Sequence, residues 1–169
     1  GDPSDPTTEL GPLSSEQAAQ TLEDQVQRSV QAGALLVLGG HRIQRPGAYF
    51  EATILTDIQP GTPAYQEEMF GPVVAFFRVR GEDEAIALAN DTPYGLGASV
   101  FTRDVERAKR VADQLDTGMV FINHPTWTTP DLPFGGTKRS GYGRELSRLG
   151  TEEFVNKKLI RISALDDPF

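Results

Sequence analysis

Apolar side chains recur at every fourth position near the start of the chain. They are Ala18, Leu22, Val26 and Val30. This spacing places them on one face of a helix, and Gly33, a residue type that commonly ends helices, follows the last of them. Ser14, with Gln17 three residues later, matches a capping box. The pattern predicts a surface helix over residues 14–32.

After this helix the pattern changes to short runs of apolar and β-favouring residues. The run at 34–40 is bounded by glycines, as a buried strand would be, and the run at 49–58 is a second strand candidate. From residue 73 onward, strand and helix patterns alternate. The expected strands cover 73–79, 97–102 and 118–123, and the expected helices cover 82–90 and 104–115, the second of them capped by Asp104. This alternation predicts an α/β layered domain with a mainly parallel sheet and right-handed crossovers.

Length and charge narrow the range of partners. The chain of 169 residues is long enough for one domain with its own core, and its net charge is −8. An acidic surface argues against nucleic acid and anionic membranes, because phosphate groups favour clustered Lys and Arg. The sequence has no run of about 18 apolar residues, the length needed to span a bilayer, and the first residues lack the pattern of a signal peptide. We therefore expect a cytoplasmic protein whose ligand is a small molecule or another protein.

Cysteine and histidine usage limits the chemistry available to the chain. It contains no cysteine and two histidines, His41 and His124, which lie far apart in the sequence. Disulfides, thiolate metal ligands and a cysteine nucleophile are therefore excluded within this chain, and no metal is expected. A lone histidine is more often structural than catalytic, so we interpret His124 and the nearby Trp127 as loop and packing residues.

Two glycine-containing segments interrupt the alternation of strands and helices. Residues 91–99 and 133–146 are both expected to be turns. The second segment carries its glycines beside Lys138, Arg139 and Arg144, as a phosphate-binding loop would. However, its glycine order matches neither the P-loop nor the dinucleotide fingerprint, which place a strand before the glycines. We favour a backbone that passes close to a large ligand, such as the wall of a substrate tunnel.

Two adjacent carboxylates, Glu67 and Glu68, stand directly before the apolar turn formed by residues 69–72. Acidic pairs usually avoid such neighbours. Taken alone, the pair is best explained as side chains that cap or solvate a turn. A functional explanation needs more of the surrounding sequence.

Four motifs follow one another along the chain: EEMFGPV at 67–73, NDTPYGLGASVFT at 90–102, GMVFIN at 118–123 and PFGGTKRSGYGREL at 133–146. Together they resemble the C-terminal part of the catalytic domain of the NAD(P)-dependent aldehyde dehydrogenases. The opening GDPSDPTTELGPL resembles the segment just beyond the catalytic cysteine of that family, so the likeness covers nearly the whole chain. INHPTWTTPDLPFGG and the closing EFVNKKLIRI are most similar to the succinate-semialdehyde dehydrogenase branch.

The resemblance implies a role for the acidic pair. In the family, the second glutamate of the first motif hydrogen-bonds the ribose beside the nicotinamide, and the following phenylalanine lies against that end of the cofactor. Glu68 and Phe70 match these positions, which implies that they bind NAD or NADP. A carboxylate accepts two hydroxyl protons well, and an apolar ring helps to hold a planar ring in a dry pocket. The choice between NAD and NADP is made in a domain that this chain does not contain.

The resemblance also implies contacts with a small-molecule aldehyde. Phe134 matches an aromatic residue of the substrate tunnel, and a plain core phenylalanine is the alternative. Thr128 and Thr129 are candidates to hydrogen-bond a substrate carboxylate. Glu145 matches a glutamate near the catalytic base and could relay a proton, although a carboxylate that stabilises a helix N-terminus explains it equally well. Asn123 lies close to the chemistry in family members, but a turn residue that closes a strand is the alternative.

The same likeness suggests how the chain is organised. Residues 1–152 would be part of the catalytic domain, and residues 153–169 would be a C-terminal oligomerisation strand and tail. In the family, the strand that matches residues 153–162 pairs with an arm of a neighbouring subunit, which implies a homo-oligomer. A strand of the chain's own sheet is the alternative.

The resemblance implies an oxidoreductase fragment. The parent enzyme would oxidise a small aldehyde, succinic semialdehyde in the branch named above, to the carboxylic acid with NAD(P)+. Its cysteine nucleophile, main base and most of the dinucleotide-binding fold would lie before residue 1, in the missing N-terminal part. The isolated chain is then expected to be inactive. The alternative is a stand-alone noncatalytic binding or oligomerisation module of the same fold.

Overall fold

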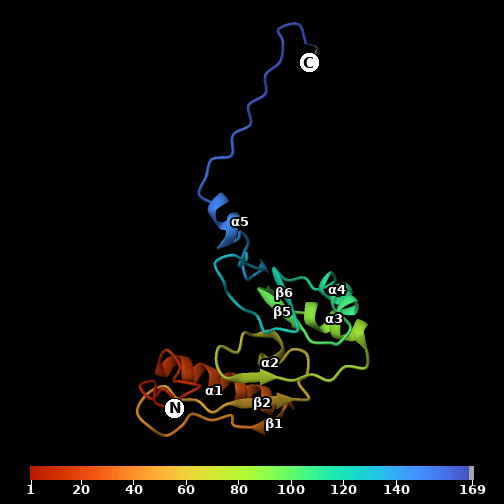
Figure 1. The fold of residues 1–169 in the computed structure, drawn as a ribbon. Helices are drawn as coiled ribbons and strands as arrows, with labels where there is room; N and C mark the ends of the chain where they lie inside the picture. Colours follow the sequence, from red (N-terminus) through yellow and green to blue (C-terminus); the bar gives the residue numbers. More distant parts are fainter. Residues whose placement is uncertain (168–169) are drawn as a thin grey trace. The chain divides into compact units, whose positions relative to one another are not determined.

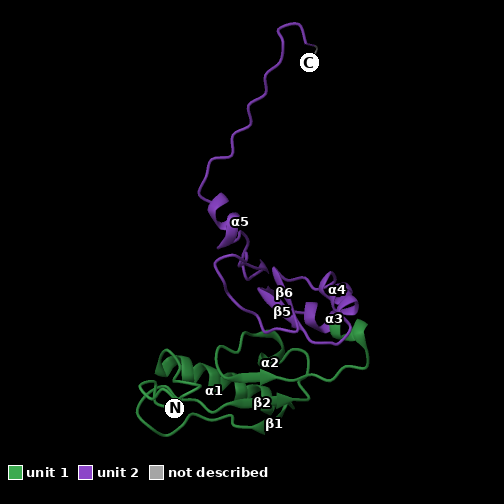
Figure 2. Cartoon of the chain, in the orientation of Figure 1, with its two compact units in different colours: residues 1–85 green, residues 86–169 purple. Residues whose placement is uncertain are grey.

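The computed structural model describes residues 1–167 of the chain (Figure 1). The chain forms two compact units, residues 1–85 and residues 86–169 (Figure 2). The helix α3, Glu82–Asn90, carries the chain from the first unit into the second. The assignment of residues 1–152 to one catalytic domain concerns a larger protein and stays a prediction.

The first unit begins with the helix α1, Glu16–Gln31, where the sequence predicted one. Its cap is Ser15 rather than Ser14, because the Ser15 hydroxyl accepts a hydrogen bond of 3.1 Å from the backbone N–H of Ala18. Ser15 is extended, with φ −161°, as a capping residue must be just before the first helical turn. The helix ends before Gly33, whose φ of +105° suits a residue without Cβ.

The buried face of α1 differs in part from the predicted apolar stripe. Leu22 and Val26 are each 1% exposed, whereas Val30 is 37% exposed. Polar Gln25 and Ser29 belong to the buried face instead. Both make hydrogen bonds to the chain packed against α1, which removes the penalty for burying them.

A three-stranded sheet of order β1-β2-β3 packs beside this helix. The strands are β1, Leu35–Leu38, β2, Thr53–Thr56, and β3, Val73–Ala75. β1 pairs with β2 in antiparallel fashion, and β2 pairs with β3 in parallel. All three lie within predicted strand runs and are shorter than those runs.

The strand β1 is an edge strand, so the prediction of a buried strand at 34–40 is wrong. It pairs with β2 alone. Leu35, Val37 and Leu38 are more than half exposed, at 54%, 56% and 54%. Leu36 points the other way and packs against the core. A continuous apolar run is compatible with either location, because it does not say how many neighbours the strand has.

The core of the first unit is built from α1, β2, the short helix α2, Pro63–Gln66, and the chain between them. Its buried members are Leu22, Val26, Ala34, Phe50, Leu55, Ile58 and Ala64. Burial of each large apolar side chain stabilises the fold by about 1.5–3 kcal/mol. This core fixes α2 against α1, and it therefore determines where the segment after α2 begins.

The second unit contains a strand-helix-strand unit that the sequence predicted. β5, Gly97–Val100, pairs in parallel with β6, Met119–Ile122, and α4, Val105–Ala112, connects them. Asp104 caps α4 as expected, because its Oδ1 accepts a hydrogen bond of 2.9 Å from the backbone N–H of Arg107. The alternating pattern of the sequence is thus confirmed here.

Two further strands lie in segments that were expected to be turns. β4, Tyr94–Gly95, pairs in antiparallel fashion with β7, Thr137–Lys138. Strands of this length leave no detectable alternation in the sequence. The α/β class is confirmed, while the sheets are mixed: β2–β3 and β5–β6 are parallel, and β1–β2 and β4–β7 are antiparallel.

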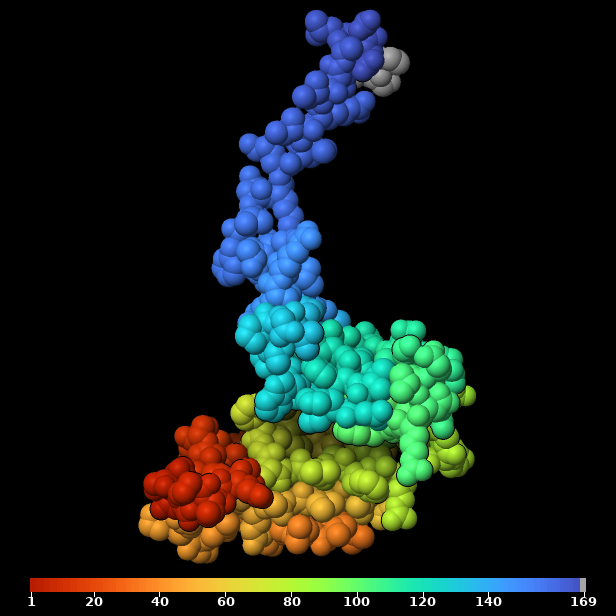
Figure 3. All heavy atoms as spheres, in the orientation of Figure 1, coloured from red at the N-terminus to blue at the C-terminus, as the bar shows by residue number. Residues whose placement is uncertain are grey.

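The chain that follows the helix α5, Ser147–Glu152, contains no strand within residues 153–167. Every one of these residues is exposed (Figure 3), and Leu159 and Ile162 reach 90% and 91%. The alternative in which residues 153–162 join the chain's own sheet is therefore wrong. Pairing with a neighbouring subunit stays a prediction, and residues 168 and 169 of the expected tail lie outside the described residues.

Candidate functional site

The candidate cofactor loop, residues 67–72, follows α2 in the first unit, and its contacts alternate along the chain. Glu67 bonds to α1, and Met69 packs against the hydrophobic core. Glu68 and Phe70 are exposed, Phe70 by 75%, and the Glu67 side chain itself keeps 42% of its surface exposed. The acidic pair is therefore divided, with one carboxylate turned toward the helix and the other toward solvent.

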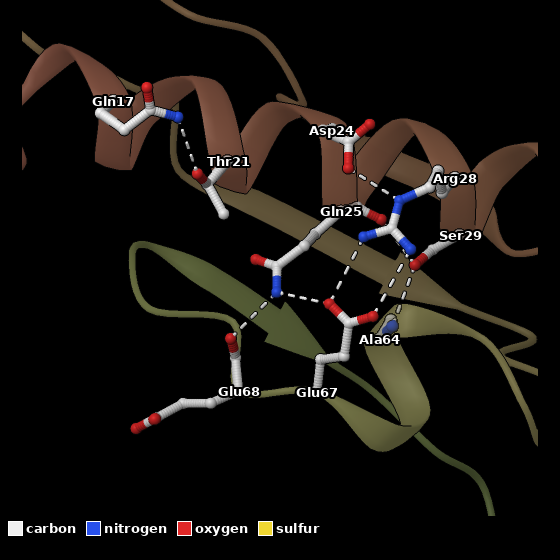
Figure 4. A network of polar contacts seen from close by, with 9 residues as sticks. All are labelled: Gln17, Thr21, Asp24, Gln25, Arg28, Ser29, Ala64, Glu67 and Glu68. Carbon is white, nitrogen blue, oxygen red and sulfur yellow. Dashed lines mark hydrogen bonds and ion pairs between the residues drawn. The ribbon is translucent and has the colours of Figure 1, made fainter.

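Glu67 lies in a network of polar side chains from α1 (Figure 4). Gln25 donates from Nε2 to Glu67 Oε2 over 2.8 Å. The two terminal nitrogens of Arg28 each lie 3.4 Å from a carboxylate oxygen of Glu67. Arg28 also donates from Nε to Asp24 Oδ2 over 2.7 Å, and the hydrogen bonds to Asp24 and then Glu67 raise the pKa of the Arg28 guanidinium. The guanidinium, which is charged in any case, links α1 to the loop through both carboxylates.

The same helix face also holds the backbone of the loop and of α2. Gln25 Nε2 lies 3.3 Å from the backbone oxygen of Glu68. The hydroxyl of Ser29, which is fully buried, accepts a hydrogen bond of 2.9 Å from the backbone N–H of Ala64. These contacts come from one face of α1, because residues three and four apart on a helix are neighbours. The loop therefore begins from a fixed position.

The carboxylate of Glu68 points away from α1, as Figure 4 shows. Within the described residues, no hydrogen bond or ion pair occupies it. A free carboxylate beside an exposed aromatic ring provides two acceptors for hydroxyl groups and an apolar surface for a planar ring. Dinucleotide binding by Glu68 and Phe70 stays a prediction, while the contacts of Glu67 with α1 are structural.

The second unit brings Phe134 and Glu145 together. Their backbones form an isolated antiparallel bridge, with hydrogen bonds of 2.9 Å from Phe134 N–H and 2.7 Å from Glu145 N–H. Both residues line a cavity of about 840 Å³, together with Tyr142 and Phe154. The cavity is large enough for a small organic molecule. Glu145 lies before α5 and does not cap it, because the N-cap position belongs to Leu146.

The basic residues of the glycine-rich segment bind the chain itself. Arg144 donates from Nη1 to the backbone oxygens of Gly136 and Gly143, over 2.9 Å and 2.7 Å. Lys138 Nζ lies 3.0 Å from the backbone oxygen of Asn90 and 3.2 Å from the carboxylate of Asp116. These internal partners occupy donors of Arg144 and Lys138 that a phosphate group would otherwise use. The interpretation as a turn close to a ligand is favoured over a phosphate loop.

The two candidate threonines lie in the same unit but not among the residues that line this cavity. Thr128 is exposed, whereas Thr129 is partly buried. The hydroxyl oxygen of Thr129 is buried without a hydrogen-bond partner among the described residues. A buried hydroxyl without a partner is unfavourable, and a polar ligand group would satisfy it. Substrate binding by Thr128 and Thr129 stays a prediction.

The three residues around the end of β6 have structural contacts. Asn123, with φ +57°, accepts a hydrogen bond of 2.8 Å at Oδ1 from the backbone N–H of Thr102. It therefore joins the ends of β5 and β6, as a turn residue does. His124 lies between aromatic neighbours, with its ring centroid 6.0 Å from that of Phe121 and 6.3 Å from that of Trp127. Both residues are exposed, Trp127 by 61%, so they are loop residues whose packing is limited to these ring contacts.

Sequence reasoning missed the side chains on α1 that hold the candidate cofactor loop. Gln25, Arg28 and Ser29 were not singled out, because polar residues on a surface helix are ordinary. The signal was present in their spacing: Gln25 and Ser29 flank Val26 on the predicted apolar face. A polar residue on an apolar face needs a partner, and here the partners lie about forty residues further along the chain.

Within residues 1–167, no helix has the length and apolar character needed to cross a membrane. In the same range, no group of three or more His, Cys, Asp or Glu side chains is placed to hold a metal ion.

Comparison with known proteins gives these features a family. Residues 1–160 match the aldehyde dehydrogenase family. A succinate-semialdehyde dehydrogenase [NADP(+)] of Deinococcus radiodurans is 61% identical over 161 residues, which is 95% of this chain and 34% of that protein. This chain thus spans about a third of the length of that relative.

Solved structures show the same likeness in three dimensions. A succinic semialdehyde dehydrogenase from Streptococcus pyogenes, in complex with NADP+, superposes with a TM-score of 0.92 at 49% identity, covering 97% of this chain and 36% of that chain. A betaine aldehyde dehydrogenase from Staphylococcus aureus, in complex with NAD+, gives 0.83 at 40% identity, covering 89% and 30%.

Fold and sequence together define an α/β protein with the aldehyde dehydrogenase fold. The chain belongs to the aldehyde dehydrogenase family. The predicted likeness to the succinate-semialdehyde dehydrogenase branch is confirmed as well.

Proposed function

We propose that the chain is the C-terminal part of an enzyme that oxidises a small aldehyde, succinic semialdehyde, to the carboxylic acid with NADP+ or NAD+. The observation that carries the proposal is the 61% identity to a succinate-semialdehyde dehydrogenase [NADP(+)] over nearly the whole chain. Such identity supports a shared substrate class, which fold similarity alone does not.

Glu68 and Phe70 are the proposed cofactor contacts in this chain. The exposed carboxylate of Glu68 would accept hydrogen bonds from ribose hydroxyls, and the ring of Phe70 would cover an apolar face. The dinucleotide, when bound, supplies the hydride acceptor for aldehyde oxidation. NADP+ is named for the Deinococcus relative and for the Streptococcus structure, and NAD+ for the betaine aldehyde dehydrogenase, so both belong to the proposal.

The second unit would contribute the substrate side. Phe134 lines a cavity with Glu145, which suits an apolar tunnel wall that guides a short aldehyde. Thr128 and Thr129 are the proposed donors to a substrate carboxylate, and the hydroxyl of Thr129 has no other partner among the described residues. Glu145, exposed beside the cavity, would pass a proton between solvent and the catalytic base.

The chain lacks a cysteine, which the thioester chemistry of the family requires. We therefore propose that the nucleophile and the main base come from the rest of the parent protein. The isolated chain, mixed with succinic semialdehyde and either dinucleotide, should form no reduced cofactor above a blank. Turnover that persists after repurification would contradict this division of labour.

The exposed tail is the proposed oligomerisation element. Residues 153–162 present apolar side chains that the described chain does not cover, and unpaired apolar segments associate readily. Truncation after Gly150 should give a smaller assembly in light scattering. A full-length chain that is monomeric, with residues 153–162 ordered on its own core, would contradict the proposal.

The decisive experiment uses the full-length protein that contains this chain. It should reduce NADP+ or NAD+ with succinic semialdehyde, and Glu68→Gln should weaken dinucleotide binding and slow hydride transfer, because a charged acceptor becomes neutral. Unchanged kinetics in Glu68→Gln would return Glu68 to a plain turn residue. If no such full-length protein exists and the chain is produced alone, the noncatalytic module becomes the better explanation.

A further inference from the structure

We propose that Gln25 and Arg28 are positioning residues for the dinucleotide, acting through Glu67 and the backbone of Glu68. The inference deepens the proposed function and rests on it, because the group that would touch the cofactor is Glu68. Gln25 and Arg28 lie on α1 and contact the loop on the side away from the Glu68 carboxylate (Figure 4).

Gln25 makes the first polar contacts that hold the loop. Gln25 is 8% exposed, and its single amide nitrogen reaches both the Glu67 carboxylate, at 2.8 Å, and the backbone oxygen of Glu68, at 3.3 Å. One side chain therefore fixes the side chain of one glutamate and the peptide group of the next. Because hydrogen bonds are directional, this contact sets the orientation of the peptide from which the Glu68 side chain departs.

Arg28 adds charge to the same contact. Its two terminal nitrogens face the two oxygens of Glu67, and Asp24 holds the third nitrogen at 2.7 Å. A guanidinium presents its donors in a rigid fork, so it restricts the rotation of the carboxylate that it faces. The fork and the amide of Gln25 together direct the Glu67 carboxylate toward α1.

An apolar contact fixes the far end of the loop. A Cβ atom at Gly71 would collide with the side chain of Leu22 on α1, and Leu13 also lies within 3.2 Å of that position. The backbone at Gly71 therefore rests directly on the helix. Met69, between the two ends, packs against the core. With both ends held, Glu68 and Phe70 face solvent together.

A purely structural role would not need this polar arrangement. Apolar side chains at positions 25 and 67 could bury similar area, but they would not fix the direction of a peptide group. The loop would then sample orientations in which the Glu68 carboxylate does not face the dinucleotide. Each such orientation would reduce the fraction of molecules that can bind the dinucleotide. The apparent dissociation constant rises in proportion as the binding-competent fraction falls.

The test uses the full-length protein and Gln25→Met, which keeps the length of the side chain and removes its donors and acceptor. Hydrogen exchange in residues 67–72, measured without dinucleotide, should become faster. Dinucleotide binding measured by calorimetry should weaken by about tenfold, because the loss of one partly buried hydrogen bond to a charged group lowers the fraction of the loop that is competent to bind. The KM for the aldehyde should not change.

The matched control is Gln27→Met, the same substitution on the exposed side of the same helix. It should change neither exchange nor binding. Glu67→Gln, which keeps an acceptor for Gln25, should bind the dinucleotide more tightly than Glu67→Met. Equal binding by Gln25→Met and the wild-type protein overturns the inference, as does equal loss in both Glu67 variants.

The outcome is separable from that of the proposed function. If Glu68→Gln weakens dinucleotide binding and Gln25→Met does not, the cofactor contact stands and the positioning role fails. If Glu68→Gln has no effect, the cofactor assignment itself is wrong. Faster exchange in residues 67–72 of Gln25→Met, with unchanged affinity, would show a structural role alone and would also overturn the inference.

Discussion

The two units of the chain differ in how much apolar surface they bury for themselves. Every member of the main hydrophobic cluster belongs to the first unit. In the second unit, the buried hydrophobic residues within the described chain are Ile86 and Ala108, while Phe101 and Tyr142 are 67% and 97% exposed. The first unit therefore carries its own core, and the second relies on secondary structure with little burial. We expect the first to be the more stable.

The candidate loops follow the same division. Residues 67–72 are held by side chains from another element, α1, and by the core. The segment at 133–146 is held mainly by its own backbone bridge and by Arg144. The comparison teaches that a loop gains a defined geometry from the core beneath it. The predictions below test this difference, beginning with the largest effect.

Removal of the central core side chain should have the largest effect. Leu22→Ala should destabilise the first unit by about 2–5 kcal/mol, because it leaves a cavity beside Leu55 and Val26. The loss of stability is measured by urea unfolding, and hydrogen exchange in α1 shows that it falls on the first unit. The matched control is Phe101→Ala in the second unit, at a side chain that is 67% exposed, which should change stability by less than about 0.5 kcal/mol. Equal effects would remove the contrast between the units.

A methyl group added where the loop rests on α1 should have the next largest effect. Gly71→Ala places a Cβ atom against the side chain of Leu22, and we expect a loss of about 1–3 kcal/mol from the strain of overpacking. Gly11→Ala is the control, because nothing lies within 4 Å of its added Cβ atom. Thermal unfolding of both variants is the measurement. A Gly71→Ala protein as stable as Gly11→Ala would mean that the loop is free to move off the helix.

Removal of the caps of α1 and α4 should have smaller effects, of similar size in the two units. Ser15 and Asp104 each accept one backbone hydrogen bond, at 3.1 Å and 2.9 Å. Ser15→Ala and Asp104→Ala should each destabilise their helix by about 1 kcal/mol. Hydrogen exchange should then rise in α1 for the first variant and in α4 for the second. Exchange that rises in both helices for either variant would show that the units unfold together.

The smallest expected effect is a pH dependence at the start of the tail. Hydrogen bonds from Lys157 and then Arg148 lower the pKa of the Glu152 carboxyl. Because the folded-state pKa lies below the unfolded value of about 4.3, this contact is complete above that pH and is lost as the pH falls through the lower folded value. An NMR titration of Glu152 measures the midpoint. Lys157→Met should raise it toward the ordinary glutamate value, and an unmoved midpoint would show that the contact does not form.

Much of the fold could be predicted from the sequence. The helix α1, the strand-helix-strand unit around α4 and the Asp104 cap each depend on residues close together in the chain, and periodicity and capping rules report such features. The exposed side of β1 could not be predicted, because it depends on how many strands flank it. The short pair β4–β7 joins segments that are distant in sequence, and neither has a periodic pattern.

What the sequence suggests about the candidate site has the same limit. The resemblance suggested Glu68, Phe70, Phe134 and Glu145, whose roles stay predictions, and the structure brings Phe134 and Glu145 to one cavity. It did not identify Gln25, whose role depends on a hydrogen bond across 42 positions of the chain. Propensity describes a residue and its near neighbours, so it cannot report a partner at that distance.

The alternating contacts of residues 67–72 have a consequence for how substitutions at the two glutamates are interpreted. The two residues are chemically identical, so their exchange leaves the sequence unchanged. They differ only in their distance along the chain from α2 on one side and from Gly71 on the other. A deletion of either codon yields the same protein. The surviving glutamate can occupy only one of the two places: it either meets Gln25 or faces solvent. The length of the acidic pair therefore sets which glutamate contacts α1 and which faces solvent. Deletion of one glutamate should weaken dinucleotide binding more than neutralising either charge does.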